Sequence, residues 1–128
     1  MSTSAALFGV LAGITGFLGV AAGAFGAHAL GAQLPSSLLQ VFETGARYQL
    51  THALALGIVA VAHDRMQRRA LTVAGWFFVV GQILFPGSLY ALALTSVPAW
   101  GAVTPIGGVC YVAGWLSLAL AFVQRKTG

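Results

Sequence analysis

The chain has 128 residues, of which 59% are hydrophobic and only 6% are charged, with a formal net charge of +4. Soluble domains carry about a quarter charged residues, so this composition excludes an ordinary cytosolic fold. It also argues against nucleic-acid binding, because five of the six cations lie in two short clusters at the ends of apolar segments. The long uncharged stretches predict four membrane spans, which leave no length for a soluble catalytic domain.

The first predicted span covers about 5–30 and carries no charged residue. A helix of this length reaches about 39 Å, enough to cross a bilayer with tilt. The preceding residues lack the positive charge of a signal peptide, so we expect the segment to be retained. Its glycines follow one helical face, which we interpret as a surface for packing against the protein's own helices, with contact to a partner subunit as the alternative. This glycine stripe consists of Gly9, Gly13, Gly16, Gly19, Gly23 and Gly26.

Three further apolar segments each predict a membrane-spanning helix. Ser37 and Gln40 match a capping box, so the helix of the second segment is expected to begin near Leu38. Pro86 predicts a kink in the third segment, because proline removes a backbone donor. Pro105 marks the start of the fourth, because proline suits the first helical turn. The three predicted spans cover about 43–63, 71–95 and 104–124.

The four spans predict an all-α transmembrane bundle of four helices, which forms one domain over residues 1–128. The distribution of positive charge predicts its orientation in the membrane. The connection 63–69 and the tail 124–126 hold five of the six cations, and four spans place both on the same side. By the positive-inside rule that side is cytoplasmic. Both termini are therefore expected in the cytoplasm, and the connections 31–47 and 96–103 on the outer side of the inner membrane.

Two polar side chains are expected near the middle of the membrane. His52 and Gln82 each lie 11 residues from the inner end of their predicted span, which is about 16 Å along a helix. The hydrocarbon core is about 30 Å thick, so both lie near its centre. We predict a neutral His52 that is hydrogen-bonded to Gln82 or Tyr48, because a charge at this depth is costly. A proton relay or a ligand site is the alternative.

A second group of polar side chains is expected at the outer interface. Glu43 and Arg47 are four residues apart, so they can pair on one helical face. We interpret this pair as an anchor at the level of the lipid headgroups. His28 is predicted to meet Glu43 at the same level. The functional alternative is an outward-facing polar pocket, completed by Ser88, Tyr90 and Thr104.

Few residues of this chain are suited to a catalytic or cofactor site. His28, Glu43 and His52 suggest a metal site of two histidines and one carboxylate. However, Glu43 and His52 are nine residues apart, which in a continuous helix places them on opposite faces about 13 Å apart along the axis. A haem between His28 and His52 is disfavoured because the two lie at different depths. We therefore predict no metal, no cofactor and no catalytic residue.

Four ordered motifs are spread along the chain: Gly-Ala-Phe-Gly-Ala-His-Ala-Leu at 23–30, Phe-Glu-Thr-Gly-Ala-Arg-Tyr-Gln-Leu-Thr-His-Ala-Leu-Ala at 42–55, Phe-Pro-Gly-Ser-Leu-Tyr at 85–90 and Thr-Pro-Ile-Gly-Gly at 104–108. Together they resemble the small four-helix membrane proteins known as domain of unknown function 423, a family that includes the eukaryotic transmembrane protein 256. The resemblance implies a helical inner-membrane protein and no established activity. The motif residues that it carries over are His28, Glu43, Tyr48, Gln49, His52, Gly87, Ser88, Tyr90, Thr104 and Pro105.

These observations favour a non-catalytic accessory or structural subunit. We expect it to contact lipid and to pack against a larger membrane protein complex, such as an energy-transducing one, or against a second copy of itself. The glycine stripe and the small mass outside the membrane support this expectation. The alternative is a small transporter or proton-linked carrier that uses a polar pocket around His52, Gln82 and Glu43. A membrane enzyme has the least support.

Overall fold

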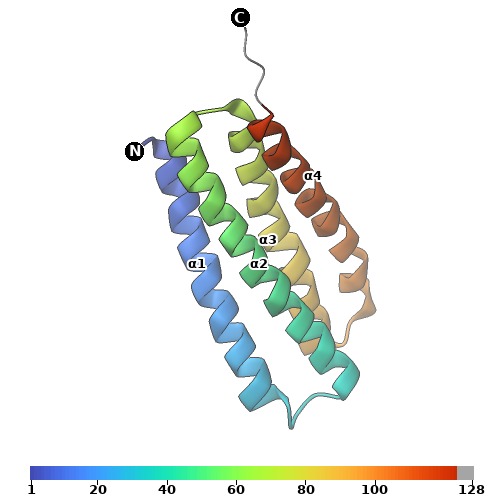
Figure 1. Ribbon diagram of the computed structural model, residues 1–128. Helices are drawn as coiled ribbons and strands as arrows, with labels where there is room; N and C mark the ends of the chain where they lie inside the picture. Colours follow the sequence, from blue (N-terminus) through green and yellow to red (C-terminus); the bar gives the residue numbers. More distant parts are fainter. Residues whose placement is uncertain (124–128) are drawn as a thin grey trace, which may run out of the picture.

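The computed structural model describes residues 1–123, which form four long helices joined by short connections (Figure 1). A π-helical turn, η1, extends the first helix directly, and a 3-10 turn, η2, precedes the fourth. No strand is present in this part of the chain. The elements are α1 (Thr3–Phe25), η1 (Gly26–Leu30), α2 (Ser36–Met66), α3 (Arg69–Thr95), η2 (Pro98–Ala102) and α4 (Thr104–Phe122).

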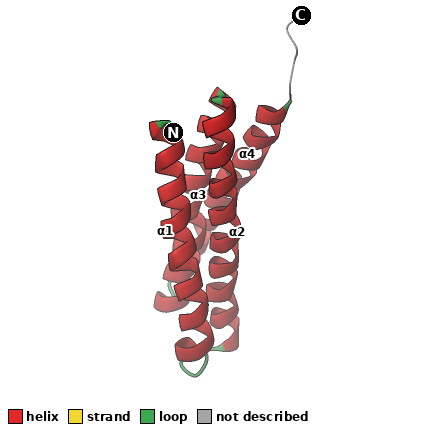
Figure 2. Cartoon of the chain, turned by 60° about the vertical axis from the view of Figure 1, so that its left-hand side comes forward, coloured by secondary structure: helices red, strands yellow, loops and turns green. Residues whose placement is uncertain are grey.

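The helices pack as neighbours in chain order. α1 packs on α2, α2 on α3 and α3 on α4, whereas α1 meets α3 over a short stretch where Phe8 contacts Gly75 and Trp76. No substantial packing joins α1 to α4 within the described residues. The two helices lie at opposite edges in Figure 1, and in Figure 2 α1 is in front and α4 at the back. The architecture is therefore an open helical bundle with α2 and α3 at its centre.

The N-terminus, the α2–α3 connection and the end of α4 all lie at one end of the molecule (Figure 1). Two contacts join these segments. Ser2 Oγ lies 3.4 Å from His63 Nδ1, and the guanidinium of Arg68 donates a hydrogen bond to the Val123 carbonyl over 3.3 Å. We call this the charged end, because residues 64–69, from the end of α2 to the start of α3, include three arginines and one aspartate. The predicted basic tail, with Arg125 and Lys126, lies outside the described residues.

Three stretches are long and apolar enough to cross a membrane: Thr3–Leu30, Arg69–Thr95 and Pro98–Phe122. The predicted first, third and fourth spans lie within or largely within them. α2 is not among these three, although its 31 residues make it the longest helix. Its polar side chains lower its hydropathy, because Glu43, Arg47, Gln49 and His52 all lie in the same helix.

The predicted capping box of α2 is wrong. The helix begins at Ser36, and Pro35 precedes it as the N-cap residue without a side-chain hydrogen bond. Ser37 therefore lies inside the first turn, where its hydroxyl does not cap the helix. Farther along the chain, α3 continues through Pro86 without interruption. The Pro86 ring is buried, so it contributes to the helix interface as well as removing a backbone donor.

The core is built from large apolar side chains that pack against glycines of α3 and α4. Phe8, Phe78 and Leu56 are fully buried. The Phe8 ring occupies the position that a Cβ atom of Gly75 would take, and the Phe78 ring lies 2.7 Å from a Cβ built on Gly114. These glycines allow an aromatic ring from a neighbouring helix to lie against the backbone.

The glycine stripe of α1 is only partly engaged. A Cβ built on Gly19 would lie 3.0 Å from Leu50 of α2, and one on Gly26 would lie 3.0 Å from Phe42. Gly9 and Gly16 face α2 at ordinary contact distances. A Cβ built on Gly13 or Gly23 would meet no atom of another helix within 4 Å. The close contacts of the stripe are therefore made with the protein's own second helix.

Replacement of Gly19 by leucine should separate α1 from α2. The new side chain would overlap Leu50, and such overpacking costs about 1–3 kcal/mol. Gly13→Leu gives the same gain in helix propensity but has open space, so it should leave stability almost unchanged. Thermal unfolding in detergent measures the difference. Equal unfolding temperatures for the two variants would contradict the described contact.

Candidate functional site

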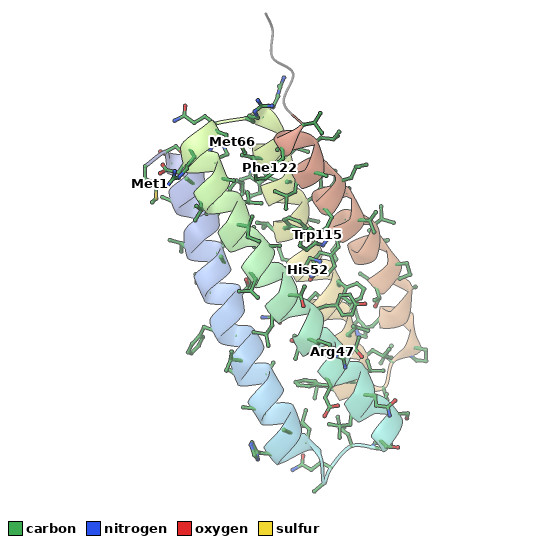
Figure 3. All side chains as sticks on the ribbon, in the orientation of Figure 1. Met1, Arg47, His52, Met66, Trp115 and Phe122 are labelled. Carbon is green, nitrogen blue, oxygen red and sulfur yellow. The ribbon has the colours of Figure 1, made fainter. Side chains whose placement is uncertain are left out.

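His52 has both ring nitrogens in hydrogen bonds. Its Nδ1 lies 2.7 Å from the backbone carbonyl oxygen of Tyr48, which can only accept, so Nδ1 carries the proton. The indole Nε1 of Trp115 donates to His52 Nε2 over 2.9 Å, so Nε2 is the acceptor. The side chain is buried at mid-height of the molecule, between α2 and α4 (Figure 3). This geometry describes a neutral imidazole in the Nδ1–H tautomer.

The prediction that His52 bonds to Gln82 or Tyr48 is confirmed for Tyr48, whose backbone carbonyl accepts the Nδ1 hydrogen bond. Gln82 bonds to the Gln49 carbonyl and not to the ring. Trp115 supplies the second bond. Trp115 could not be identified from the sequence, because it lies 63 residues away on a helix whose rotation relative to α2 is set by tertiary packing.

Aromatic rings surround the imidazole. The ring of Tyr111 stacks on it, with centroids 3.5 Å apart and an interplanar angle of 8°. Phe78 and Trp115 approach at centroid distances of 5.7 Å. The nearly parallel Tyr48 ring is more distant, at 6.1 Å. The imidazole is therefore fixed in orientation by packing as well as by hydrogen bonds.

Two glutamines connect the four helices. Gln82 Nε2 donates to the Gln49 backbone carbonyl over 2.9 Å, and the Tyr111 hydroxyl donates to Gln82 Oε1 over 2.5 Å. The Tyr90 hydroxyl donates to Gln49 Oε1 over 2.7 Å. Gln49 Nε2 donates to the Thr15 backbone carbonyl over 2.8 Å. The chain of bonds runs from α1 through α2 and α3 to α4, and we call it, together with His52 and Trp115, the polar network.

The polar network is fully partnered. Within the described residues, no buried side-chain nitrogen or oxygen lacks a hydrogen-bond partner. Each bond removes the cost of placing a polar group in an apolar surrounding. On the side of Glu43, the polar network ends at Tyr90. The ring of Tyr90 packs against the ring of Phe42, the residue before Glu43, at a centroid distance of 4.8 Å.

The predicted outer pocket forms only in part. Ser88 Oγ donates to the Phe85 carbonyl and lies 2.6 Å from Thr104 Oγ1, which joins α3 to the start of α4. Tyr90, the third predicted member, is directed to Gln49 instead.

The charged and ionisable members of that pocket are apart from this pair. His28 is exposed on η1, Glu43 is half-buried and Arg47 is exposed. Among the described residues, no side-chain hydrogen bond joins His28 to Glu43 and no ion pair joins Glu43 to Arg47. The structure therefore gives no support to the predicted meeting of His28 and Glu43 or to the predicted ion pair, and both stay predictions. Side chains this close to a helix end can extend into solvent or headgroups, where pairing gains little.

A second buried histidine was missed in the sequence. His63 ends the predicted second span, but it is buried at the charged end. Its Nε2 lies 2.8 Å from Thr72 Oγ1, and its Nδ1 lies 3.4 Å from Ser2 Oγ. The histidine thus links the N-terminus of the chain with α2 and α3. Its proximity to charged residues in the sequence hid this role.

Two hollows border the polar network. One, of about 550 Å³, lies between α2, α3 and α4 beside His52, Tyr111 and Trp115. The other, of about 520 Å³, lies between α1, α2 and α3 beside Gln49 and Gln82. Over the described part of the chain, no group of three histidine, cysteine, aspartate or glutamate side chains is placed to hold a metal ion.

The comparisons with known proteins agree on one family. The family described as Protein of unknown function (DUF423) matches residues 22–108. The chain belongs to this family. A membrane protein of Bacillus subtilis, UPF0382 membrane protein YwdK, is 41% identical over 92% of this chain and 97% of its own length. UPF0382 inner membrane protein YgdD of Escherichia coli K12 is 42% identical over 91% of this chain and 89% of its own length.

A third DUF423 relative, UPF0382 membrane protein SH2409 of Staphylococcus haemolyticus, is 40% identical over 90% of this chain and 93% of its own length. No solved structure matches the chain significantly. The family resemblance seen in the four motifs is confirmed. Three of its helical stretches are long and apolar enough to cross a membrane, and its Escherichia coli relative is named an inner membrane protein. This DUF423 chain is therefore a multi-pass protein of the inner membrane.

Proposed function

We propose that this DUF423 protein is a non-catalytic accessory or structural protein of the inner membrane, which packs laterally against other membrane proteins or against a second copy of itself. The observation that carries the proposal is the complete pairing of the polar network. A transport or catalytic site needs polar groups that are free to exchange partners. Here each polar side chain at the centre of the network has a hydrogen bond to a neighbouring helix: Gln49 to α1, Gln82 to α2 and His52 to α4.

The outer surface supports lateral association. Large apolar side chains are exposed on all four helices, including Phe17 at 72%, Leu54 at 73%, Ile83 at 67% and Val112 at 69%. In a membrane these faces contact lipid tails or the apolar surface of a partner. Exchange of lipid for a well-packed helix is favourable only where shapes fit closely. The proposed association therefore depends on shape rather than on charge.

The proposal includes four membrane crossings. α2 lies between α1 and α3, so its buried polar side chains Gln49 and His52 face neighbouring helices while those helices face lipid. If α1, α3 and α4 cross the membrane, α2 crosses with them. The charged end then faces the cytoplasm, because the arginines of the α2–α3 connection lie there.

Single-cysteine labelling tests this topology. In a Cys110→Ser background, Met66→Cys should react with a membrane-impermeant reagent only from the cytoplasmic side. Ala99→Cys lies in η2 at the opposite end, so it should react only from outside. Labelling of both cysteines from one side would contradict four crossings, and the reversed pattern would contradict the orientation.

Co-purification tests the accessory role. The protein is extracted in a mild detergent after cross-linking in intact membranes, and the retained proteins are identified by mass spectrometry. A stable complex with defined partners, or a defined homo-oligomer, is expected. A monomer that small solutes stabilise would contradict the proposal.

A small transporter is the second candidate, because the two hollows beside the polar network would hold a small molecule. In that case Trp115→Phe, which frees His52 Nε2 to bind a solute, should change the rate of solute uptake without changing assembly.

A further inference from the structure

We propose that the groove between α1 and α2 binds one acyl chain of an anionic phospholipid, whose headgroup is held by Arg65. The groove has a volume of about 1100 Å³. Its floor is α2, with Leu50, Ala53, Gly57 and Ile58, and its wall on one side is α1, with Gly16. This inference concerns a lipid site and does not depend on the accessory role proposed above.

Small residues create the groove. A Cβ built on Gly57 would have no neighbouring atom within 4 Å, so the glycine leaves open space in the floor. Ala53 and Ala62 line the same space. On the opposite face of α2, by contrast, Leu56 and Val59 are fully buried in the core. One face of α2 thus carries the large residues that fill the core, and the opposite face carries the small residues that line the groove.

The dimensions suit a lipid chain from one leaflet. Leu50 and Arg65 are 15 residues apart on a continuous helix, which is about 22 Å along its axis. Half of a hydrocarbon core is about 15 Å thick. The groove can therefore hold a single extended chain from the headgroup level to the middle of the membrane. Met66 and Phe122 line its last part at the charged end (Figure 3).

Charge selects the headgroup. Of the described residues that line the groove, only Arg65 is charged, and its side chain is exposed at the charged end. Asp64 lines a neighbouring hollow together with Arg65 and Met1. Arg68 and Arg69 follow in the same connection, so the local charge is positive. A cation at headgroup level beside an apolar groove is suited to an anionic phospholipid.

A second copy of the chain fits this groove less well. Two copies with the same orientation in the membrane would bring their charged ends together. Each end carries Arg65, Arg68 and Arg69 against one aspartate, so the two would repel each other. A phospholipid has the opposite charge at this position.

The test uses the full chain, purified in a mild detergent. Native mass spectrometry and thermal unfolding are measured with added phosphatidylglycerol and with phosphatidylcholine of the same acyl chains. For the wild type we expect saturable retention of one phosphatidylglycerol, with about a fivefold preference over phosphatidylcholine, the factor that corresponds to one basic residue near anionic headgroups. Arg65→Gln should lose this preference, and Arg65→Lys should keep most of it.

Matched variants separate the groove from general charge effects. Gly57→Leu fills the open space without meeting another residue, so it should reduce retention of both lipids while the protein remains folded. Gly13→Leu adds the same side chain outside the groove, and Arg69→Gln removes a charge outside it. Both should behave like the wild type.

Three results would overturn the inference. The first is equal retention of the two lipids by the wild type. The second is an equal loss in Arg65→Gln and Arg69→Gln, which would indicate a nonspecific basic surface. The third is a dimer that Gly57→Leu dissociates, together with no lipid preference, which would assign the groove to a second copy.

Discussion

Gly107→Ala should destabilise the protein by about 2–3 kcal/mol, the upper part of the range for overpacking. A Cβ built on Gly107 would lie 2.5 Å from the backbone nitrogen of Phe85 and 2.8 Å from its Cα. The obstructing atoms belong to the backbone of α3, so no side-chain rotation relieves the clash. α4 must move away from α3, and the Ser88–Thr104 contact nearby should be lost with it.

Gly108→Ala is the matched control. It adds the same methyl group to the next position of the same helix, where the nearest atoms of the Phe85 ring are 3.8 Å away. The alanine should be neutral or slightly stabilising, because it has a higher helix propensity than glycine. Thermal unfolding of the two variants in the same detergent measures the contrast. A stable Gly107→Ala protein would show that α3 and α4 are not in this close contact.

Gln82→Leu should destabilise the protein by about 1–3 kcal/mol, the cost of leaving a buried polar group without a partner. The Tyr111 hydroxyl would lose its acceptor, and the Gln49 carbonyl would lose a donor. Interhelical hydrogen bonds within membranes average only about 0.6 kcal/mol, so most of the loss should come from the unpaired hydroxyl.

The double variant Gln82→Leu/Tyr111→Phe tests this explanation. It removes the unpaired hydroxyl, so it should be more stable than Gln82→Leu alone and should lose less than the two single variants together. Tyr111→Phe still permits stacking on His52. Additive losses in the cycle would contradict the bond between Tyr111 and Gln82.

Much of the fold could be predicted from composition. The long uncharged stretches predicted helices at α1, α3 and α4. His52 and Gln82, which were expected to lie close together, both contact Tyr111. Charge clusters indicated which connection lies beside the N-terminus. These features depend on local hydrophobicity and on helix geometry, both of which are encoded along the chain.

The partners of the polar residues could not be predicted in the same way. Depth in the membrane is a single coordinate, whereas a hydrogen bond also depends on how each helix is rotated. Gln82 was predicted at the same depth as His52, but it bonds to the backbone of Gln49, while Trp115 bonds to the imidazole. The rotation of α4 follows from contacts at Gly107 and Gly114, which a single sequence does not identify as close.

The glycines illustrate the same limit. Regular spacing made the α1 stripe conspicuous, yet Gly13 and Gly23 face open space. The closest approaches involve Gly75, Gly81 and Gly107, which follow no regular spacing. Their importance depends on which aromatic ring or backbone lies opposite, and this is decided by the packing of separate helices.

The protonation of His52 is the most direct test of the claim that the polar network is structural. Nitrogen-15 NMR of the histidine side chains, recorded at neutral pH on the protein in lipid nanodiscs, distinguishes the two tautomers and the charged ring. We predict a neutral His52 with the proton on Nδ1, and a changed Nε2 resonance in Trp115→Phe. A doubly protonated ring, or a proton on Nε2, would contradict the account and favour a role in proton transfer.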